Sequence, residues 1–272
     1  MRAAKYPERI VCLTEETTET LYLLGEEARI VGISGFTVRP PRARREKPRV
    51  SAFTSAKLDK ILALQPDLVL GFSDLQADIA ADLIRVGVNV LVFNQRSVAE
   101  ILDTILQLGA LVGVPERAAA LVDGYRRQLA TLADDPPAHR PRIYFEEWDE
   151  PRISAIRWVS ELIHIAGGED IFPELAARPL GRERILADDR EILARAPEIV
   201  IGSWCGKKFR PERVAARPGW SGLPAVQDGE LHEIKSADIL QPGPAALGDG
   251  LAQLRKIILA WQARRGGAVA HG

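Results

Sequence analysis

Two pairs of adjacent carboxylates follow apolar runs that are typical of buried strands. Glu15 and Glu16 follow the first such run, and Glu146 and Glu147 follow a later one. Ligands of open α/β sheets bind beyond the carboxyl ends of the strands, so these acids can meet a cation, a metal centre or the hydrogen-bond donors of a ligand. The alternative, which suits Glu16 and Glu146 best, is that one acid of each pair faces solvent or caps a helix amino terminus.

Three of the five tryptophans also fall at predicted strand ends or helix starts, namely Trp148, Trp158 and Trp204. Flat aromatic faces at the rim of a site bind large planar or cationic ligands. Each of these tryptophans taken alone is equally compatible with packing beneath a loop. Their common placement favours an aromatic wall around a ligand.

Four further residues occupy comparable positions beside predicted strands, namely Phe36, Phe53, Cys205 and Asp238. Cys205 can bind a soft metal or react, although a small buried apolar residue is the commoner role for such a cysteine. Because Cys12 is the only other cysteine, no disulfide framework is predicted. A single bridge between the two stays open.

The sequence lacks the motifs that mark several kinds of catalytic and nucleotide-binding site. There is no Gly-x-x-x-x-Gly-Lys-Ser/Thr loop, no Gly-x-Gly-x-x-Gly after a strand and no Gly-x-Ser-x-Gly turn. The four histidines show no close pairing with one another or with a cysteine, so a zinc site is not expected. The sequence therefore predicts a protein that is not an enzyme and has neither a metal nor a covalent cofactor.

The charge balance excludes a protein built mainly to bind nucleic acid. The chain has 36 basic and 37 acidic residues, a net charge of −1, whereas nucleic-acid binding needs a basic footprint. The sharpest local charge is the segment 39–49, which contains Arg39, Arg42, Arg44, Arg45, Lys47 and Arg49. Its prolines predict a solvated loop, and the alternative is a surface that grips anionic groups. No apolar run reaches the ~20 residues needed for membrane insertion.

Short apolar runs alternate with helical periodicity before residue 98 and again after residue 141, which is typical of a parallel sheet with helices on both faces. From 98 to 134 only helical spacing persists. A continuous helix there would be roughly 54 Å long, although Pro115 favours a break. We therefore predict an N-terminal α/β lobe over 1–97, a linking long helix over 98–134 and a C-terminal α/β lobe over 135–272, with the ligand in the cleft between the lobes.

An ordered series of motifs extends over nearly the whole chain, from Arg9 to about Trp261. It includes RIVCLTEETTETLYLLGEEARIVGIS, KLDKILALQPDLVLG, WVSELIHIAGGEDIF, REILARAPEIVIGSW and RPGWSGLPAVQDGEL. The series resembles the periplasmic-binding-protein-like superfamily in its long-helix class, which holds the vitamin B12-, haem- and ferric-siderophore-binding proteins of ABC importers. FEEWDEP and IRWVSELI are most similar to the cobalamin-binding branch.

The resemblance implies a class III solute-binding protein fold, in which two three-layer α/β lobes with mainly parallel sheets are joined by one long backbone helix. It implies a ligand clasped between preformed faces, which limits the ordering cost of binding. By position, it assigns the walls of the site to Phe36, Phe53, Trp148, Trp158 and Trp204. It assigns polar contacts to Glu15, Glu147 and Asp238.

Two positions depart from the pattern of the importer-docking members, which present an acidic residue on each lobe to arginines of the permease. The alignment implied by the resemblance puts Asp59 at the first position and Arg190 at the second. A like-charge contact at the second position would oppose docking. No secretory signal pattern precedes the first strand, so we expect a cytoplasmic monomer that does not dock on an importer.

The leading hypothesis is a non-catalytic binding protein for a corrinoid, such as cobalamin, or a related tetrapyrrole such as haem. The first alternative is the substrate-binding component of an ABC importer for cobalamin, haem or a ferric siderophore, periplasmic after removal of a signal peptide. The second alternative is a metal-handling protein or enzyme that uses Glu15, Glu147 and Cys205 around a metal.

Overall fold

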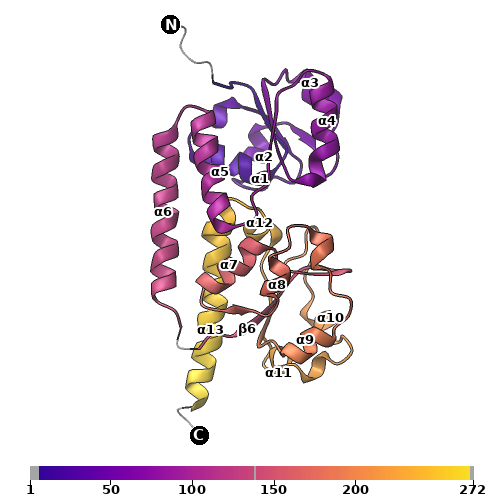
Figure 1. Ribbon diagram of the computed structural model, residues 1–272, viewed down its shortest axis with the longest axis vertical. Helices are drawn as coiled ribbons and strands as arrows, with labels where there is room; N and C mark the ends of the chain where they lie inside the picture. Colours follow the sequence, from indigo (N-terminus) through magenta and orange to yellow (C-terminus); the bar gives the residue numbers. More distant parts are fainter. Residues whose placement is uncertain (1–5, 138, 270–272) are drawn as a thin grey trace. The chain divides into compact units, whose positions relative to one another are not determined.

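The computed structural model describes residues 6–137 and 139–269. The chain forms two compact units (Figure 1). The N-terminal unit contains the described residues up to 95, together with 99–124 and 241–245. The C-terminal unit contains 96–98, 125–240 and the described residues from 246 onward.

The N-terminal unit is built on a five-stranded parallel sheet with the strand order β3-β2-β1-β4-β5. Its strands are β1 (Ile10–Cys12), β2 (Ile30–Ser34), β3 (Arg49–Ser51), β4 (Leu68–Phe72) and β5 (Val90–Phe93). Its helices are α1 (Glu15–Leu23), α2 (Ala43–Glu46), α3 (Leu58–Ala63), α4 (Ala77–Arg85) and most of α5 (Val98–Leu111), with short 3₁₀ turns η1 (Glu27–Arg29) and η2 (Asp74–Gln76).

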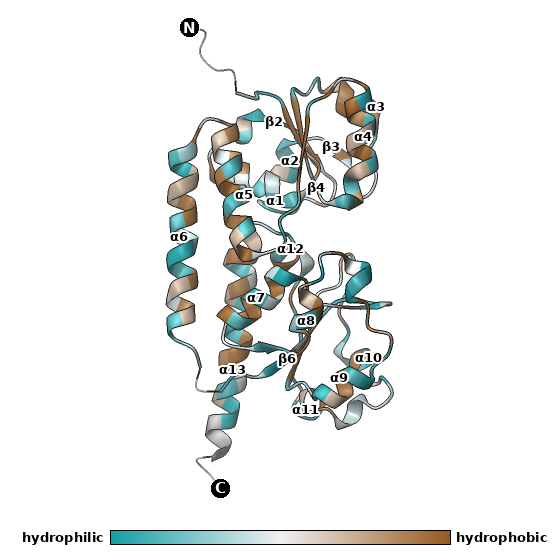
Figure 2. Ribbon diagram, in the orientation of Figure 1, coloured by the Kyte–Doolittle hydropathy of each residue, from teal (hydrophilic) through white to brown (hydrophobic). Residues whose placement is uncertain are grey.

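Both faces of this sheet are covered. Alternate residues of a strand point to opposite faces, and Ile10 packs in a cluster with Leu21 of α1 and Leu108 of α5. Its neighbour Val11 packs in a second cluster with side chains of α3 and α4. Burial on both faces explains why the strands read as continuous apolar runs. Figure 2 shows hydrophobic residues on these strands and many hydrophilic residues along α6 (Pro115–Asp134).

The segment predicted as one long linking helix is two helices. α5 ends at Leu111, and α6 begins at Pro115. Gly113 has a φ of +80° and lies between them; this left-handed conformation favours glycine. The restart at Pro115 follows the preference of proline for the first helical turn. α6 begins in the N-terminal unit and ends in the C-terminal unit, with the division after Gly124.

The C-terminal unit has a second five-stranded sheet, in which β10-β9-β6-β7 follow in order and β8 also pairs with β6. Its strands are β6 (Arg142–Asp149), β7 (Arg152–Ser154), β8 (Glu169–Asp170), β9 (Ile199–Gly202) and β10 (Leu231–Glu233). Only the β6–β7 pairing is antiparallel. Besides part of α6, its α-helices are α7 (Arg157–Ile165), α8 (Pro173–Ala176), α9 (Arg190–Arg195), α10 (Pro211–Ala215), α11 (Pro224–Gln227), α12 (Ser236–Ile239) and α13 (Leu251–Val269). Shorter turns are η3 (Gly181–Arg184), η4 (Trp220–Gly222) and a π-helical turn η5 (Ala246–Gly250).

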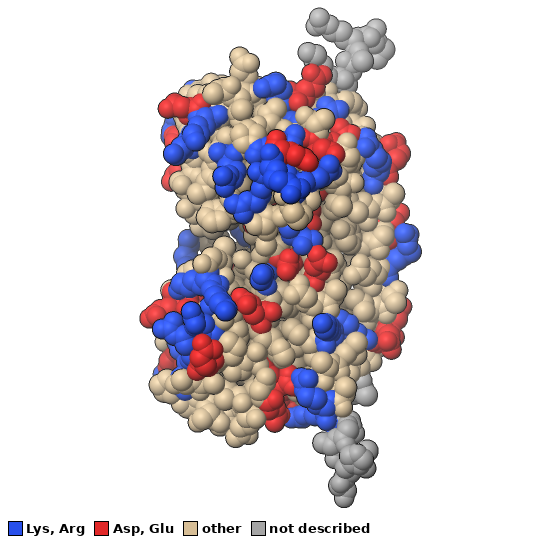
Figure 3. All heavy atoms as spheres, turned by 180° about the vertical axis from the view of Figure 1, so that it is seen from behind, with Lys and Arg blue, Asp and Glu red and all other residues tan. Residues whose placement is uncertain are grey.

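The basic segment predicted as a solvated loop contains regular structure. Ala43–Glu46 forms α2, and Arg49 begins β3. Figure 3 shows Lys and Arg side chains gathered over part of the N-terminal unit. In the part of the chain that the structure describes, no helix has the length and apolar character needed to cross a bilayer.

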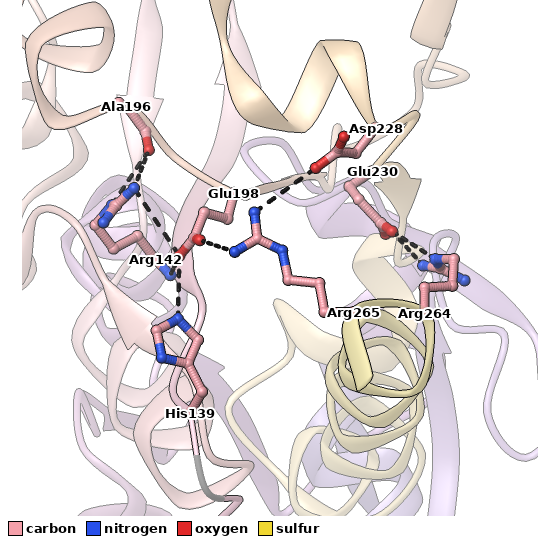
Figure 4. A network of polar contacts seen from close by, with 8 residues as sticks. All are labelled: His139, Arg142, Ala196, Glu198, Asp228, Glu230, Arg264 and Arg265. Carbon is pink, nitrogen blue, oxygen red and sulfur yellow. Dashed lines mark hydrogen bonds and ion pairs between the residues drawn. The ribbon is translucent and has the colours of Figure 1, made fainter. Parts of the chain in front are cut away.

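A polar network ties α13 to the amino-terminal edge of the second sheet (Figure 4). Arg265 pairs with Glu198 at 3.0 Å, and Glu198 also accepts a hydrogen bond from the Arg142 amide at 3.1 Å. Arg264 pairs with Glu230 in the same region. Ion pairs therefore connect α13 to this edge of the sheet.

Candidate ligand-binding site

The carboxyl ends of β1, β2 and β3 share one edge of the first sheet, because these strands are parallel neighbours. The structure accordingly brings Glu15, Phe36 and Phe53 to this edge. Phe36 is exposed and Phe53 is half-buried. Glu15 opens α1 and accepts a hydrogen bond from the Val38 amide at 3.2 Å.

Glu15, Glu16 and Glu19 form a buried acidic cluster in α1. Thr14 Oγ1 donates to Glu16 Oε1, whereas Glu16 Oε2 is buried with no hydrogen-bond partner among the described residues. Burial raises the pKa of Glu15 and of Glu16 to about 7. Because Glu16 is buried, the alternative in which it faces solvent is wrong; it lies in the first turn of α1, at the helix amino terminus.

The segment 241–245 covers this acidic cluster. Glu19 Oε2 accepts a hydrogen bond from the Ala245 amide at 3.1 Å, and Glu19 Oε1 lies 2.9 Å from Arg39 Nε. A Cβ atom on Gly243 would lie 2.5 Å from the Cβ of Glu16. Glycine is thus required for this close approach.

Gln76 connects three strand ends at the same edge and was missed by sequence reasoning. Its Nε2 donates to the carbonyl oxygens of Leu13, at 3.3 Å, and Phe53, at 2.9 Å, while its Oε1 accepts from the Phe72 amide. The side chain is 1% exposed. Gln76 is the last residue of η2 and directly precedes α4, so no helical periodicity marks it in the sequence.

In the C-terminal unit, Glu146 lies at the centre of a buried network. It accepts two hydrogen bonds from Arg217, at 2.7 and 2.8 Å, and one from the Trp204 indole at 3.2 Å. The Tyr144 hydroxyl donates a further bond at 3.0 Å. Burial, together with the charge of Glu146, raises the pKa of Tyr144. Glu146 therefore neither faces solvent nor caps a helix, contrary to the alternative raised from sequence.

A polar pocket of about 420 Å³ lies beside Trp204 at the carboxyl end of β6 and β9. Its lining consists of Asp149, Glu150, Arg152, Trp204, Lys207, Arg213, Val214 and Arg217. Trp148 is half-buried next to it, with Lys207 Nζ 4.3 Å from the centroid of its ring. Lys207 also pairs with Asp149 at 2.8 Å.

The lack of a side chain at Gly202 leaves room for the ring of Phe209 beside Trp204. A Cβ at this last residue of β9 would lie 2.1 Å from the ring of Phe209. Phe209 in turn contacts Trp204, with ring centroids 5.1 Å apart. The glycine thus permits Phe209 to pack against Trp204, which lines the pocket.

The side chain of Glu147 contacts a different arginine from that of Glu146. Successive side chains of a strand point to opposite faces, and Glu147 pairs at 2.6 Å with Arg184, whose side chain is 1% exposed. Trp158 is buried and donates to the Ile239 carbonyl at 2.9 Å. Asp238, in α12, accepts a hydrogen bond from Gln253 at 3.2 Å. Their ligand contacts stay predictions.

Both cysteines are free thiols. Cys12 is fully buried, and burial raises its pKa to about 12. Cys205 is exposed, so the interpretation as a buried apolar residue is wrong. Among the residues that the structure describes, no three His, Cys, Asp or Glu side chains are grouped to hold a metal ion.

The two positions compared with importer-docking relatives are both exposed. Asp59 lies in the first turn of α3. Arg190 opens α9 and pairs with Asp188 at 2.6 Å, so its charge is partly compensated.

Comparisons with known proteins place the chain among binding proteins. Its sequence matches the profile described as periplasmic binding protein over residues 10–237. A vitamin B12-binding protein of Vibrio parahaemolyticus is 26% identical over 245 residues, which are 88% of this chain and 86% of that protein.

Solved structures share the fold. A possible iron-binding, periplasmic solute-binding protein of Staphylococcus epidermidis superimposes with a TM-score of 0.78 and 22% identity, covering 93% of this chain and 99% of the other. A periplasmic haem-binding protein of Pseudomonas aeruginosa gives a TM-score of 0.76 and 24% identity, covering 93% and 92%. At these identities the likeness shows the fold, and the predicted architecture of two α/β lobes with mainly parallel sheets is confirmed.

Proposed function

The chain belongs to the periplasmic binding protein family, and on that basis we propose that it is a non-catalytic binding protein for a corrinoid or a related tetrapyrrole. The observation that carries the proposal is the pocket beside Trp204, with Trp148 next to it. Indole rings bind large planar ligands, and the pocket adds side chains that bind polar substituents.

The polar lining suits the periphery of such a ligand. Arg217 and Lys207 have carboxylate partners, at Glu146 and Asp149. Arg213 is exposed and has no ion pair within the described ranges, so its guanidinium has free donors. Corrinoids and haems carry amide or carboxylate arms, which accept such hydrogen bonds.

The relatives support the ligand class. The Vibrio protein is named for vitamin B12 and the Pseudomonas protein for haem. Both ligands are large macrocycles with polar arms. A contribution from Glu15, Phe36 and Phe53, and a location of the ligand between the two units, stay predictions.

The substrate-binding component of an importer is the second candidate, and the solved relatives described as periplasmic favour it. The cytoplasmic location and the lack of importer docking expected from sequence have no support in these comparisons and stay predictions. Fractionation of the native cells separates the two: recovery with periplasmic markers would favour the importer component.

Absorbance titration with hydroxocobalamin, dicyanocobinamide and haemin tests the ligand class. We expect at least one to bind with a Kd below roughly 100 µM, about 5.5 kcal/mol at 25 °C. Riboflavin, a planar ligand of another class, serves as the control and should not bind. Failure of all three macrocycles to bind below that concentration would contradict the proposal.

A further inference from the structure

The segment 39–60 concentrates positive charge. It has eight basic and two acidic residues, a net charge of +6, whereas the whole chain has −1 and the remainder therefore −7. Such asymmetry is typical of a surface that meets an anionic partner. None of these ten charged residues lines the pocket beside Trp204.

The contacts of α2 make this surface rigid. Ala43 is fully buried, and the Tyr22 hydroxyl donates to Glu46 Oε2 at 2.7 Å. The guanidinium of Arg42 lies 4.7 Å from the centroid of the Tyr22 ring. These contacts fix one side of the short helix against the core, so the exposed side chains of Arg44 and Arg45 project from a fixed backbone.

Much of this charge has no partner. Arg42 pairs with Glu27 at 2.8 Å, but Arg44, Arg45 and Arg49 are exposed and form no ion pair with any residue that the structure describes. Lys57 extends the surface, because its amide donates to the Val50 carbonyl, next to Arg49, at 3.2 Å. We call Arg44, Arg45, Arg49 and Lys57 the basic platform.

The basic platform lacks the apolar anchors of a protein interface. Stable protein interfaces depend on a few large, mostly aromatic side chains. The large exposed apolar residues of the described chain all lie outside 39–60. A charged lipid surface requires no such anchor, because each Lys or Arg close to it contributes by charge alone.

We propose that the basic platform docks this protein on an anionic lipid surface. The attraction is electrostatic, so it weakens as salt shortens the range over which charges interact. This docking depends on neither the identity of the bound ligand nor the proposed function.

Sedimentation with lipid vesicles tests the proposal. We expect binding to phosphatidylcholine vesicles that contain about 30% phosphatidylglycerol at about 50 mM salt, and loss of binding at about 300 mM. The triple variant R44Q/R45Q/R49Q should partition roughly a hundredfold more weakly. The control R178Q/R182Q/K235Q removes three exposed basic residues of the C-terminal unit and should partition like the wild type.

Equal thermal unfolding midpoints of the two triple variants would establish that both are folded. The proposal would be overturned if the wild type sedimented equally well with pure phosphatidylcholine vesicles and with vesicles that contain phosphatidylglycerol. It would also be overturned if R44Q/R45Q/R49Q had the same partition coefficient as the wild type. Binding to immobilised poly-glutamate without binding to vesicles would assign the basic platform to an acidic protein, and would also overturn it.

Discussion

Both carboxylate pairs are predicted to follow a strand, but the structure places only Glu15 and Glu16 there, at the start of α1, whereas Glu146 and Glu147 lie within β6. Glu146 and Glu147 each have an arginine, Arg217 and Arg184 respectively. Glu15 and Glu16 are buried but have no basic group within ion-pair distance in the described structure, and burial raises their pKa values to about 7. The first pair therefore has raised pKa values, whereas each acid of the second forms an ion pair, and Arg217, the partner of Glu146, lines the pocket. Similar sequence patterns therefore produce different electrostatics.

Removing the Glu146 carboxylate should have the largest effect. In Glu146→Ala, the Arg217 charge and the Trp204 indole lose their buried partner, and we expect a loss of about 3–5 kcal/mol of unfolding free energy. Urea denaturation measures it. Glu169→Ala, at an exposed position of β8, is the control. A loss below about 1 kcal/mol would show that the ion pair does not hold this edge of the sheet.

Glu16→Gln should act in the opposite direction and depend on pH. The pKa of Glu16 is raised from 4.5 to about 7, so the folded protein retains a proton that the unfolded chain releases. Below about pH 4.5 Glu16 is protonated in both states, and its burial costs the wild type no unfolding free energy through ionisation. As the pH rises from there through about 7, the unfolding free energy falls by up to about 3 kcal/mol in total. Gln removes this dependence.

Unfolding free energies of the wild type and Glu16→Gln at pH 5 and pH 8 give the test, with Glu169→Gln as the control. The unfolding free energy of the variant minus that of the wild type should be larger at pH 8 than at pH 5. An equal pH dependence in both proteins would mean that Glu16 is ionised in the folded state, and the contrast between the two pairs would disappear.

Arg213→Gln should have the smallest effect. This exposed arginine lines the pocket, so its loss removes one hydrogen-bond donor and should weaken ligand binding roughly threefold. Lys208→Gln, in the same region but outside the pocket lining, should leave the affinity unchanged. Equal affinities of wild type and Arg213→Gln would remove this residue from the site.

The elements with strong patterns could be predicted from sequence. The runs at β1, β4 and β9 are apolar because both faces of these strands are buried. β3 was missed, because only Val50 of its three residues is buried and so no period appears. The prolines around α2 concealed a single helical turn, which tertiary contacts of Ala43 and Glu46 stabilise.

The site could be predicted only in outline. The rule that ligands bind at the carboxyl ends of strands pointed to Trp148 and Trp204, and the structure has a pocket beside these two residues, whose ligand contacts stay predictions. The partners of the acids could not be found, because Arg217 is 71 residues from Glu146 and Arg184 is 37 residues from Glu147. Such pairings depend on the packing of the whole C-terminal unit.

The affinity of Trp148→Leu for the best-binding macrocycle tests the central claim most directly. Trp148 is half-buried beside the pocket, and we predict at least a tenfold rise in Kd, the usual scale for losing an aromatic anchor, with a wild-type unfolding free energy. Tyr6→Leu, which changes an exposed aromatic of the N-terminal unit, should bind like the wild type. A folded Trp148→Leu protein with unchanged affinity would contradict the placement of the ligand at this edge of the second sheet.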